Sequence, residues 1–273
     1  NADIRRRVAG RVGAEGDDPY SLLAAVGRDC VGALQFLPEG APVTPAGAIE
    51  AEALDDDGVA VILHNLGRAP LGLEPDEAFR ISIAGAQEKT ALLWWQERWN
   101  KPLGTTATTH IFKPQIGQLP NGIDLSNSVE NEHLCLTFLG ALGLAVAPTR
   151  IAIFGDRPVL VVERFDRLWA RDGRLLRRPQ EDMCQALSVP STRKYEDHGG
   201  PGVADIMRLL AASDRPDVDR RMVMKAIIAF WLIGATDGHA KNFSVFLSPG
   251  GRFSATPLYD VLSAEPSLAA HQV

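Results

Sequence analysis

The sequence predicts an α+β fold of two packed lobes, with a β-rich lobe over residues 1–165 and a mostly helical lobe over residues 166–273. Short runs rich in β-branched and aromatic residues crowd the later part of the first segment. Longer apolar patterns at helical spacing dominate the second segment. A cleft between two packed lobes commonly binds a ligand, so we expect a site where the two segments meet.

Length and composition limit the kinds of protein that this chain can be. A chain of 273 residues can form two lobes, and 45% hydrophobic residues are enough for sizeable cores. The net charge of −6 argues against a broadly basic nucleic-acid binder. Cys30, Cys135 and Cys184 lie far apart and favour a reduced cytoplasmic protein over a disulfide scaffold. No apolar run approaches the ~18 residues of a membrane span.

The first elements are expected to be mixed. In DDPYSLLAAVG, Asp18 and Pro19 stand where a helix would begin, and apolar residues follow at helical spacing. CVGALQFLP indicates a strand, and residues 47–67 indicate a pair of short helices.

Strand patterns begin at Phe79. FRISIAGAQEKTALLWW consists of two β-rich runs joined by small residues, and THIFKP indicates another strand. SNSVENEHLCLTFLGALGL is typical of a helix with capping residues at its start. RIAIFG and PVLVVERF indicate two strands that turn at Gly155 and Asp156.

The last third is predicted to be helical up to a final hairpin. VADIMRLLAA and VDRRMVMKAIIAFWLIGAT predict two helices, and the second is apolar enough to suggest a buried central helix. FSVFLS and FSATPLYD predict a hairpin that turns at Pro249, Gly250 and Gly251.

The stretch ATDGHAKNFSVF, which follows that long helix, contains the strongest chemical signal. Asp237 and Asn242 are five positions apart, and Asp260 follows on the next hairpin. This spacing is typical of kinase-type phosphoryl transfer, in which the first Asp orients the attacking hydroxyl and the Asn and second Asp bind Mg²⁺. The motif is short, so polar loop residues at a helix end remain an alternative.

Upstream residues match the same chemistry. Within the expected phosphate loop, residues 82–89, the small residues Ala84, Gly85 and Ala86 allow backbone N–H groups to approach an anion closely. Lys113 ends the strand HIFK, where a phosphate-contacting lysine is expected. Taken alone, the small residues are explained by an ordinary turn, and Lys113 by a lysine exposed to solvent. The order of loop, lysine and Asp–Asn motif along the chain is harder to obtain by chance.

Several blocks together resemble the HipA family of bacterial toxin kinases. They are RISIAGAQEKTALL, HIFKPQ, SVENEHLCLTFLGALGL, VVERFDR, RPQEDMCQALSVPSTRKYE, TDGHAKNFS and PLYDVLSA. The resemblance implies a protein-kinase-like fold with ATP in a cleft between the lobes. It also implies a Ser/Thr protein kinase, with glutamyl-tRNA synthetase as the best-known substrate. A HipB-like helix-turn-helix antitoxin, and operator DNA through it, are the implied partners.

Carried over by position, the resemblance assigns the catalytic loop 237–242. Asp237 is implied as the catalytic base, Asn242 and Asp260 as Mg²⁺ ligands, and Lys113 as a contact to the ATP phosphates.

The resemblance also implies contacts to the rest of the nucleotide. The backbone of Glu163 and Phe165 is implied to meet the adenine as the hinge between the lobes. Gln180 and His239 are implied to contact the nucleotide.

Ser82 matches the serine that family members autophosphorylate. That phosphorylation would pull the AGAQEK loop away from ATP. A phosphate would add roughly −1.5 to −2 charges beside a loop that itself cradles phosphates. From the residues alone, Ser82 is better described as a small polar residue that alternates in a strand.

Some roles stay open. Glu130 or Glu132 is a candidate partner of Lys113, although either would also complement a helix N-terminus. Lys241 would reach the γ-phosphate or face solvent. Asp166 would anchor the hinge or lie exposed in a loop.

Two other functions are compatible with the motif. Asp237, His239 and Asn242 in D-x-H-x-x-N also resemble the catalytic loop of phosphatidylinositol kinases, which suggests a lipid or small-molecule kinase. The chain has no basic amphipathic helix for a membrane surface. A non-catalytic co-repressor that binds nucleotide is the other alternative. The family usually has a further N-terminal β-subdomain and a longer C-lobe, so we expect a chain truncated at both ends, or a split relative.

Overall fold

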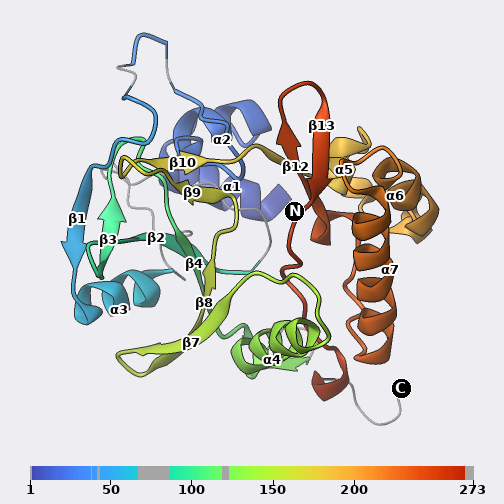
Figure 1. Cartoon of the computed structure of the whole chain (residues 1–273). Coiled ribbons are helices and arrows are strands. Elements are labelled where there is room, and N and C mark those ends of the chain that lie inside the picture. Colours follow the sequence, from blue (N-terminus) through green and yellow to red (C-terminus); the bar gives the residue numbers. More distant parts are fainter. Residues whose placement is uncertain (1, 38, 42–43, 67–86, 119–122, 268–273) are drawn as a thin grey trace. The chain divides into compact units, whose positions relative to one another are not determined.

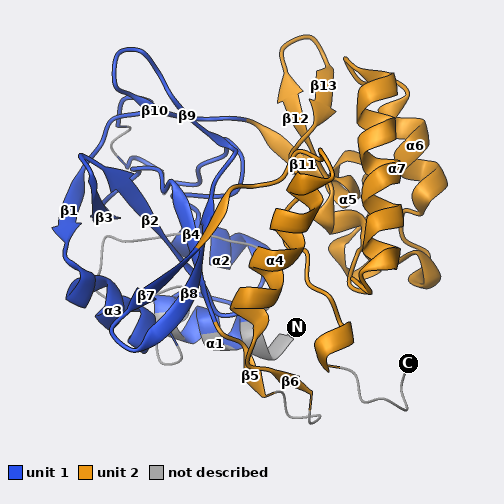
Figure 2. Ribbon diagram, turned by 60° about the horizontal axis from the view of Figure 1, so that its bottom comes forward, with its two compact units in different colours: residues 1–114, 151–178 blue, residues 115–150, 179–273 orange. Residues whose placement is uncertain are grey.

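The computed structural model describes residues 2–37, 39–41, 44–66, 87–118 and 123–267. Its fold is mixed α+β, as predicted. The chain divides into two compact units, residues 1–114 with 151–178 and residues 115–150 with 179–273 (Figure 2). This division differs from the expected boundary after residue 165: residues 115–150 group with the C-terminal segment, and residues 166–178 group with the N-terminal one.

Unit 1 is built on a six-stranded sheet with the order β1-β3-β2-β4-β8-β7 (Figure 1). Strand β4 pairs antiparallel with β2 on one side and with β8 on the other. The bounds are Ala51–Leu54 for β1, Thr90–Trp95 for β2, Arg98–Pro102 for β3, His110–Pro114 for β4, Thr149–Phe154 for β7 and Arg157–Glu163 for β8.

One part of the core of unit 1 lies against one face of this sheet. Leu92, Phe112 and Val161 lie on neighbouring strands in a register that puts their side chains on the same face, and all three are buried. Helix α3 (Asp56–Asn65) adds the buried side chains of Val59 and Leu63 to this core.

Two helices begin the chain, α1 (Ala2–Val12) and α2 (Pro19–Val26). As predicted, Asp18 caps α2. Its Oδ1 accepts hydrogen bonds from the backbone N–H of Tyr20 at 2.9 Å and of Ser21 at 3.1 Å.

Two predictions for the N-terminal part are wrong. Residues 30–37 form no strand, because side chains bind their backbone: the carbonyl of Cys30 accepts from Arg164, and the N–H of Gly32 donates to Asp166. Residues 47–67 were expected to hold two helices, but Ala51–Leu54 is strand β1. Its antiparallel pairing with β3 is a tertiary contact that no local pattern encodes.

The side chains that bind this segment form a buried ion cluster. Asp166 is only 3% exposed and pairs with Arg164. It is therefore not the exposed loop carboxylate that was one of its two expected roles. Strands β9 (Arg167–Trp169) and β10 (Leu175–Arg177) pair with each other and supply two further arginines. The cluster therefore comprises Asp29, Arg164, Asp166, Arg167 and Arg177.

In its described residues, unit 2 combines four α-helices with a three-stranded antiparallel sheet, order β11-β12-β13. Strands β12 and β13 are the predicted hairpin. The helices are α4 (Ser128–Ala141), α5 (Met183–Ala186), α6 (Val203–Leu210) and α7 (Pro216–Leu232). The strands are β11 (Gln180–Asp182), β12 (Ser244–Ser248), β13 (Arg252–Ala255) and the separate pair β5 (Gly117–Gln118) and β6 (Asp124–Leu125).

Helix α7 is not the fully buried central helix that its composition suggested. Val223, Ala226 and Phe230 are buried in the core of unit 2, but Ile228 is half exposed and Trp231 is 80% exposed. Among the helices of the described chain, none combines the length and hydropathy needed to cross a membrane. All three cysteines are free and buried.

Candidate active site

The Asp237–Asn242 segment lies between the end of α7 and the start of β12, at the junction that the sequence indicated. The rings of Phe230 and Phe243 stack at 5.7 Å and join the two ends of this loop. A Cβ at Gly238 would lie 2.9 Å from the Phe230 ring, so glycine permits the close packing. The loop is thus held by aromatic packing on unit 2.

Asn242 links this loop to Asp260. The buried Asn242 accepts a hydrogen bond from the N–H of His239 through Oδ1 at 3.1 Å, and its Nδ2 donates to the carbonyl of Asp260 at 3.2 Å. Asp260 has a φ of +60°, which is rare for a residue other than glycine but is tolerated best by Asp and Asn. Two residues that the sequence separates by eighteen positions are therefore neighbours.

The Lys194–Tyr195 dipeptide covers the other side of the loop. The Tyr195 hydroxyl donates to Asp237 Oδ1 at 2.6 Å, and Lys194 Nζ lies 2.7 Å from His239 Nε2. The carbonyl of Lys194 accepts from the N–H of Ala240 at 3.2 Å. The sequence pattern did not single out these residues; the block SVPSTRKYE was the only signal that could have found them.

His239 has one buried nitrogen without a partner. An ammonium group only donates, so the contact with Lys194 makes His239 Nε2 an acceptor and leaves the proton of the neutral ring on Nδ1. Burial and the positive charge of Lys194 lower the pKa of His239, which favours that neutral ring. His239 Nδ1 is buried with no hydrogen-bond partner, and so is Gln180 Oε1 on β11. One orphaned donor and one orphaned acceptor are groups that a ligand can satisfy.

Lys241 was expected either to contact the γ-phosphate or to face solvent. Its Nζ pairs with the carboxylate of Asp182, which also caps α5 by accepting from the N–H of Gln185. The two candidate glutamates of α4 differ. Glu130 is exposed and accepts from Gln115 at 2.7 Å, whereas Glu132 is 1% exposed.

The other predicted site residues belong to unit 1. Lys113 lies on β4 opposite Leu160 and is 6% exposed. Glu163 is the exposed last residue of β8, and Phe165 follows it half buried. Ser82, Ala84, Gly85 and Ala86 lie outside the described residues, as does most of the expected phosphate loop.

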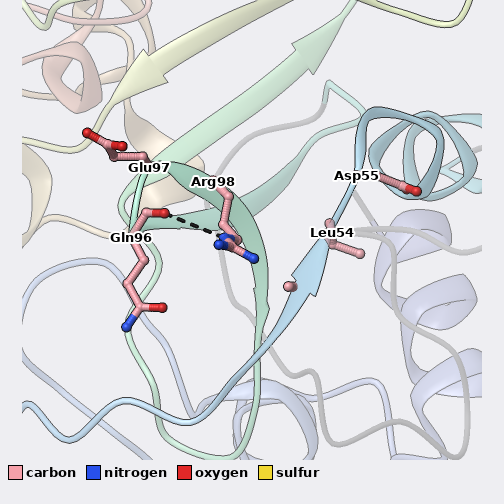
Figure 3. Close-up of a pocket in the computed structure, with 6 residues that line it drawn as sticks. Leu54, Asp55, Gln96, Glu97 and Arg98 are labelled. Carbon is pink, nitrogen blue, oxygen red and sulfur yellow. Dashed lines mark hydrogen bonds between the residues drawn. The ribbon is translucent and has the colours of Figure 1, made fainter.

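Within the described ranges, no group of three or more His, Cys, Asp or Glu side chains could hold a metal ion alone. Asn242 and Asp260 offer two oxygen donors, a set that suits Mg²⁺ when phosphate oxygens and water supply the rest. The open depression in Figure 3 lies elsewhere, on unit 1 between β1 and the β2–β3 turn. Leu54, Asp55, Gln96, Glu97 and Arg98 line it, and none of the predicted site residues does.

Comparison with known families decides the relationship. Residues 81–272 match the HipA-like C-terminal domain. The chain belongs to the HipA family. Residues 1–37 match the HipA N-terminal domain.

Two curated relatives are similar over nearly the whole chain. The kinase candidate Y4mE of Sinorhizobium fredii is 39% identical over 94% of this chain and 61% of its own length. The serine/threonine-protein kinase toxin HipA of Shewanella oneidensis is 34% identical over 93% of this chain and 58% of its own. The chain thus spans about three fifths of the relatives that it matches.

A solved HipA structure has a similar fold. It is the Shewanella oneidensis HipA in complex with HipB and operator DNA, with a TM-score of 0.74 and 27% identity. The similarity covers 95% of this chain and 61% of that protein.

Proposed function

We propose that this chain is an ATP- and Mg²⁺-dependent Ser/Thr protein kinase of a bacterial toxin–antitoxin module, acting in the cytoplasm. The observation that carries the proposal is the contact of Asn242 with Asp260 beside Asp237, within a chain of the HipA family. Phosphoryl transfer needs positioning and charge stabilisation more than covalent chemistry, and these residues supply both.

Asp237 is proposed to orient the substrate hydroxyl and accept its proton. Its side chain is 72% exposed, so a protein substrate can reach it. Asn242 and Asp260 would hold the metal through side-chain oxygens, and the hydrogen bond between them sets their spacing. Bound Mg²⁺ would neutralise the charge on the phosphate oxygens.

His239 and Gln180 are proposed to contact the nucleotide. The orphaned Nδ1–H of His239 would donate to it, and the orphaned Oε1 of Gln180 would accept from it. Lys113 would contact the phosphates, and the backbone of Glu163 and Phe165 the adenine.

The proposed ATP site lies in a cleft between two lobes, with Ala84, Gly85 and Ala86 over the phosphates. Ser82 is proposed as an autophosphorylation site whose added charge inactivates the enzyme. The substrate is proposed to be a serine of a translation-related protein, by resemblance glutamyl-tRNA synthetase. A HipB-like antitoxin is the proposed partner, since the Shewanella relative forms a complex with HipB and operator DNA.

Intact mass before and after incubation with Mg·ATP tests the activity. Dephosphorylated wild type, Ser82→Ala and Asp237→Ala are compared. We expect one added phosphate on wild type only, mapped to Ser82, with Asp237→Ala still binding ATP. Phosphate on the Asp237→Ala protein would contradict the role of the base.

Neither alternative predicts an added phosphate on the protein itself, and ATP consumption and ATP binding separate the two. A lipid or small-molecule kinase would consume ATP only when its own hydroxyl substrate is added. A co-repressor would bind ATP without turnover. Either outcome would replace the protein-kinase proposal.

A further inference from the structure

The dipeptide Lys194–Tyr195 contacts the catalytic loop at four points. The Tyr195 hydroxyl donates to Asp237 Oδ1 at 2.6 Å, and its ring meets the His239 ring edge-on at 5.1 Å. Lys194 contacts His239 Nε2 through Nζ at 2.7 Å and Ala240 through its carbonyl at 3.2 Å. The dipeptide thus reaches three successive parts of the proposed site: the base, the nucleotide contact and the turn after them.

We propose that Lys194 and Tyr195 are positioning residues. Lys194 sets the tautomer of His239, and Tyr195 sets the orientation of the Asp237 carboxylate. The inference rests on the proposed kinase function. It assigns separate tasks to two adjacent residues, one acting on nucleotide binding and the other on phosphate transfer.

Tyr195 leaves one oxygen of Asp237 for the substrate. The hydroxyl of Tyr195 and the more distant His239 Nε2, at 3.9 Å, both approach Oδ1 of Asp237. Within the described chain, Oδ2 of Asp237 has no hydrogen-bond partner. A carboxylate held by one oxygen presents the other in a defined direction, which a flexible and exposed side chain would not do alone.

Tyr195 donates a hydrogen bond to Asp237 and does not compete with it as a base. Its hydrogen bond to Asp237, followed by burial, raises the pKa of Tyr195 to about 12. The phenol therefore keeps its proton throughout the neutral range, where Asp237 must accept a proton from the substrate.

Lys194 fixes the hydrogen-bonding pattern of His239. With Nε2 accepting from the ammonium group, the proton of the neutral ring stays on the orphaned Nδ1. Loss of Lys194 would let the proton move to Nε2 and turn Nδ1 into an acceptor, which repels a phosphate or ribose oxygen.

The backbone around the dipeptide is tightly packed. The carbonyl of Tyr195 accepts from the N–H of Gly200 at 2.9 Å. A Cβ at Gly200 would lie 2.1 Å from the carbonyl oxygen of Arg193 and 2.6 Å from that of Tyr195. These contacts hold the dipeptide in place, so Gly200→Ala offers a way to displace it without altering either side chain.

The test separates kcat from the KM for ATP. We expect Tyr195→Phe, which keeps the ring, to lower kcat about 10- to 100-fold with an unchanged KM. We expect Lys194→Met to raise the KM for ATP at least about 5-fold with a smaller change in kcat. Tyr20→Phe is the matched control, because Tyr20 is 83% exposed on unit 1, and it should leave both constants unchanged. Gly200→Ala should change both constants together.

A second measurement does not depend on activity. If the Tyr195–Asp237 bond exists in solution, Tyr195→Phe should lower the unfolding midpoint of wild type but not that of Asp237→Ala. Equal shifts in both backgrounds would overturn the positioning role.

The outcomes distinguish this inference from the function on which it rests. An active wild type whose Tyr195→Phe and Lys194→Met variants change kcat and KM in the same proportion would overturn the inference alone. A wild type that transfers no phosphate to itself or to a protein would overturn the proposed function and the inference with it.

Discussion

Asp29 Oδ1 lies 2.9 Å from Arg167 Nη2, although 138 residues separate them, and both side chains are only 2% exposed. Arg164 and Arg177 also contact Asp29, and Thr108 Oγ1 donates to it at 2.7 Å. This carboxylate thus joins the segment matched to the HipA N-terminal domain to strands β9 and β10 and to the residue that follows β8. The cluster has three arginines and two aspartates. Burial and then the neighbouring Arg164 lower the pKa of Arg167 to about 10.

Asp29→Asn should destabilise unit 1 by about 3–5 kcal/mol, because it leaves buried arginines without enough negative charge. Denaturant unfolding followed by circular dichroism measures the change. Asp172→Asn is the control, since Asp172 pairs with Arg174 in an exposed turn and should unfold like wild type. Equal stability of Asp29→Asn and wild type would rule out a structural role for the cluster.

The same cluster should make the protein acid-sensitive. Burial raises the pKa of Asp166, but Arg164 and Arg167 outweigh it and lower that pKa below 3.8; the arginines do the same for Asp29. A carboxylate with a lowered folded-state pKa contributes stability that is present above its unfolded pKa of 3.8 and is lost as pH falls through the folded value. The free energy of unfolding should therefore fall below about pH 4, and less steeply in Asp166→Asn. A variant as steep as wild type would contradict the assignment.

Asp260→Gly should increase stability but abolish transfer. A left-handed φ costs a residue with a side chain roughly 1–2 kcal/mol, partly offset by the greater chain entropy of glycine, so a gain of up to about 1 kcal/mol is expected. Glu97→Gly is the control: Glu97 has a φ of +58° in the β2–β3 turn and should show at least the same gain with full activity. Thermal unfolding and Mg·ATP turnover check both. Retained turnover in Asp260→Gly would exclude it as a metal ligand.

Leu139→Ala should destabilise unit 2 by about 2–5 kcal/mol, because Leu139 is fully buried in its core and the change leaves a cavity. Leu134, on the same helix, is 68% exposed, so Leu134→Ala should cost far less. Urea unfolding compares the two variants. Similar losses would mean that the face of α4 that carries Leu139 is not the buried one.

Local sequence determined the elements that long apolar runs and turn residues mark. The helices of VENEHLCLTFLGA and MVMKAIIAF and the hairpin that begins at Ser244 form as predicted, because these signals lie within the segments themselves. The sequence also indicated the spacing of the proposed site residues, because only a short loop and a hairpin connect Asp237, Asn242 and Asp260.

Tertiary structure decided the elements and side-chain pairs that depend on residues far apart in the sequence. Residues 30–37 are not a strand because arginines far along the chain bind their backbone, and β1 exists only because β3 pairs with it. Lys241 pairs with Asp182, and Tyr195 reaches Asp237 across 42 positions. Such pairings depend on which chain segments meet after folding. Periodicity and spacing cannot encode them, because a side chain's partner is set by the packing of elements that are distant in sequence.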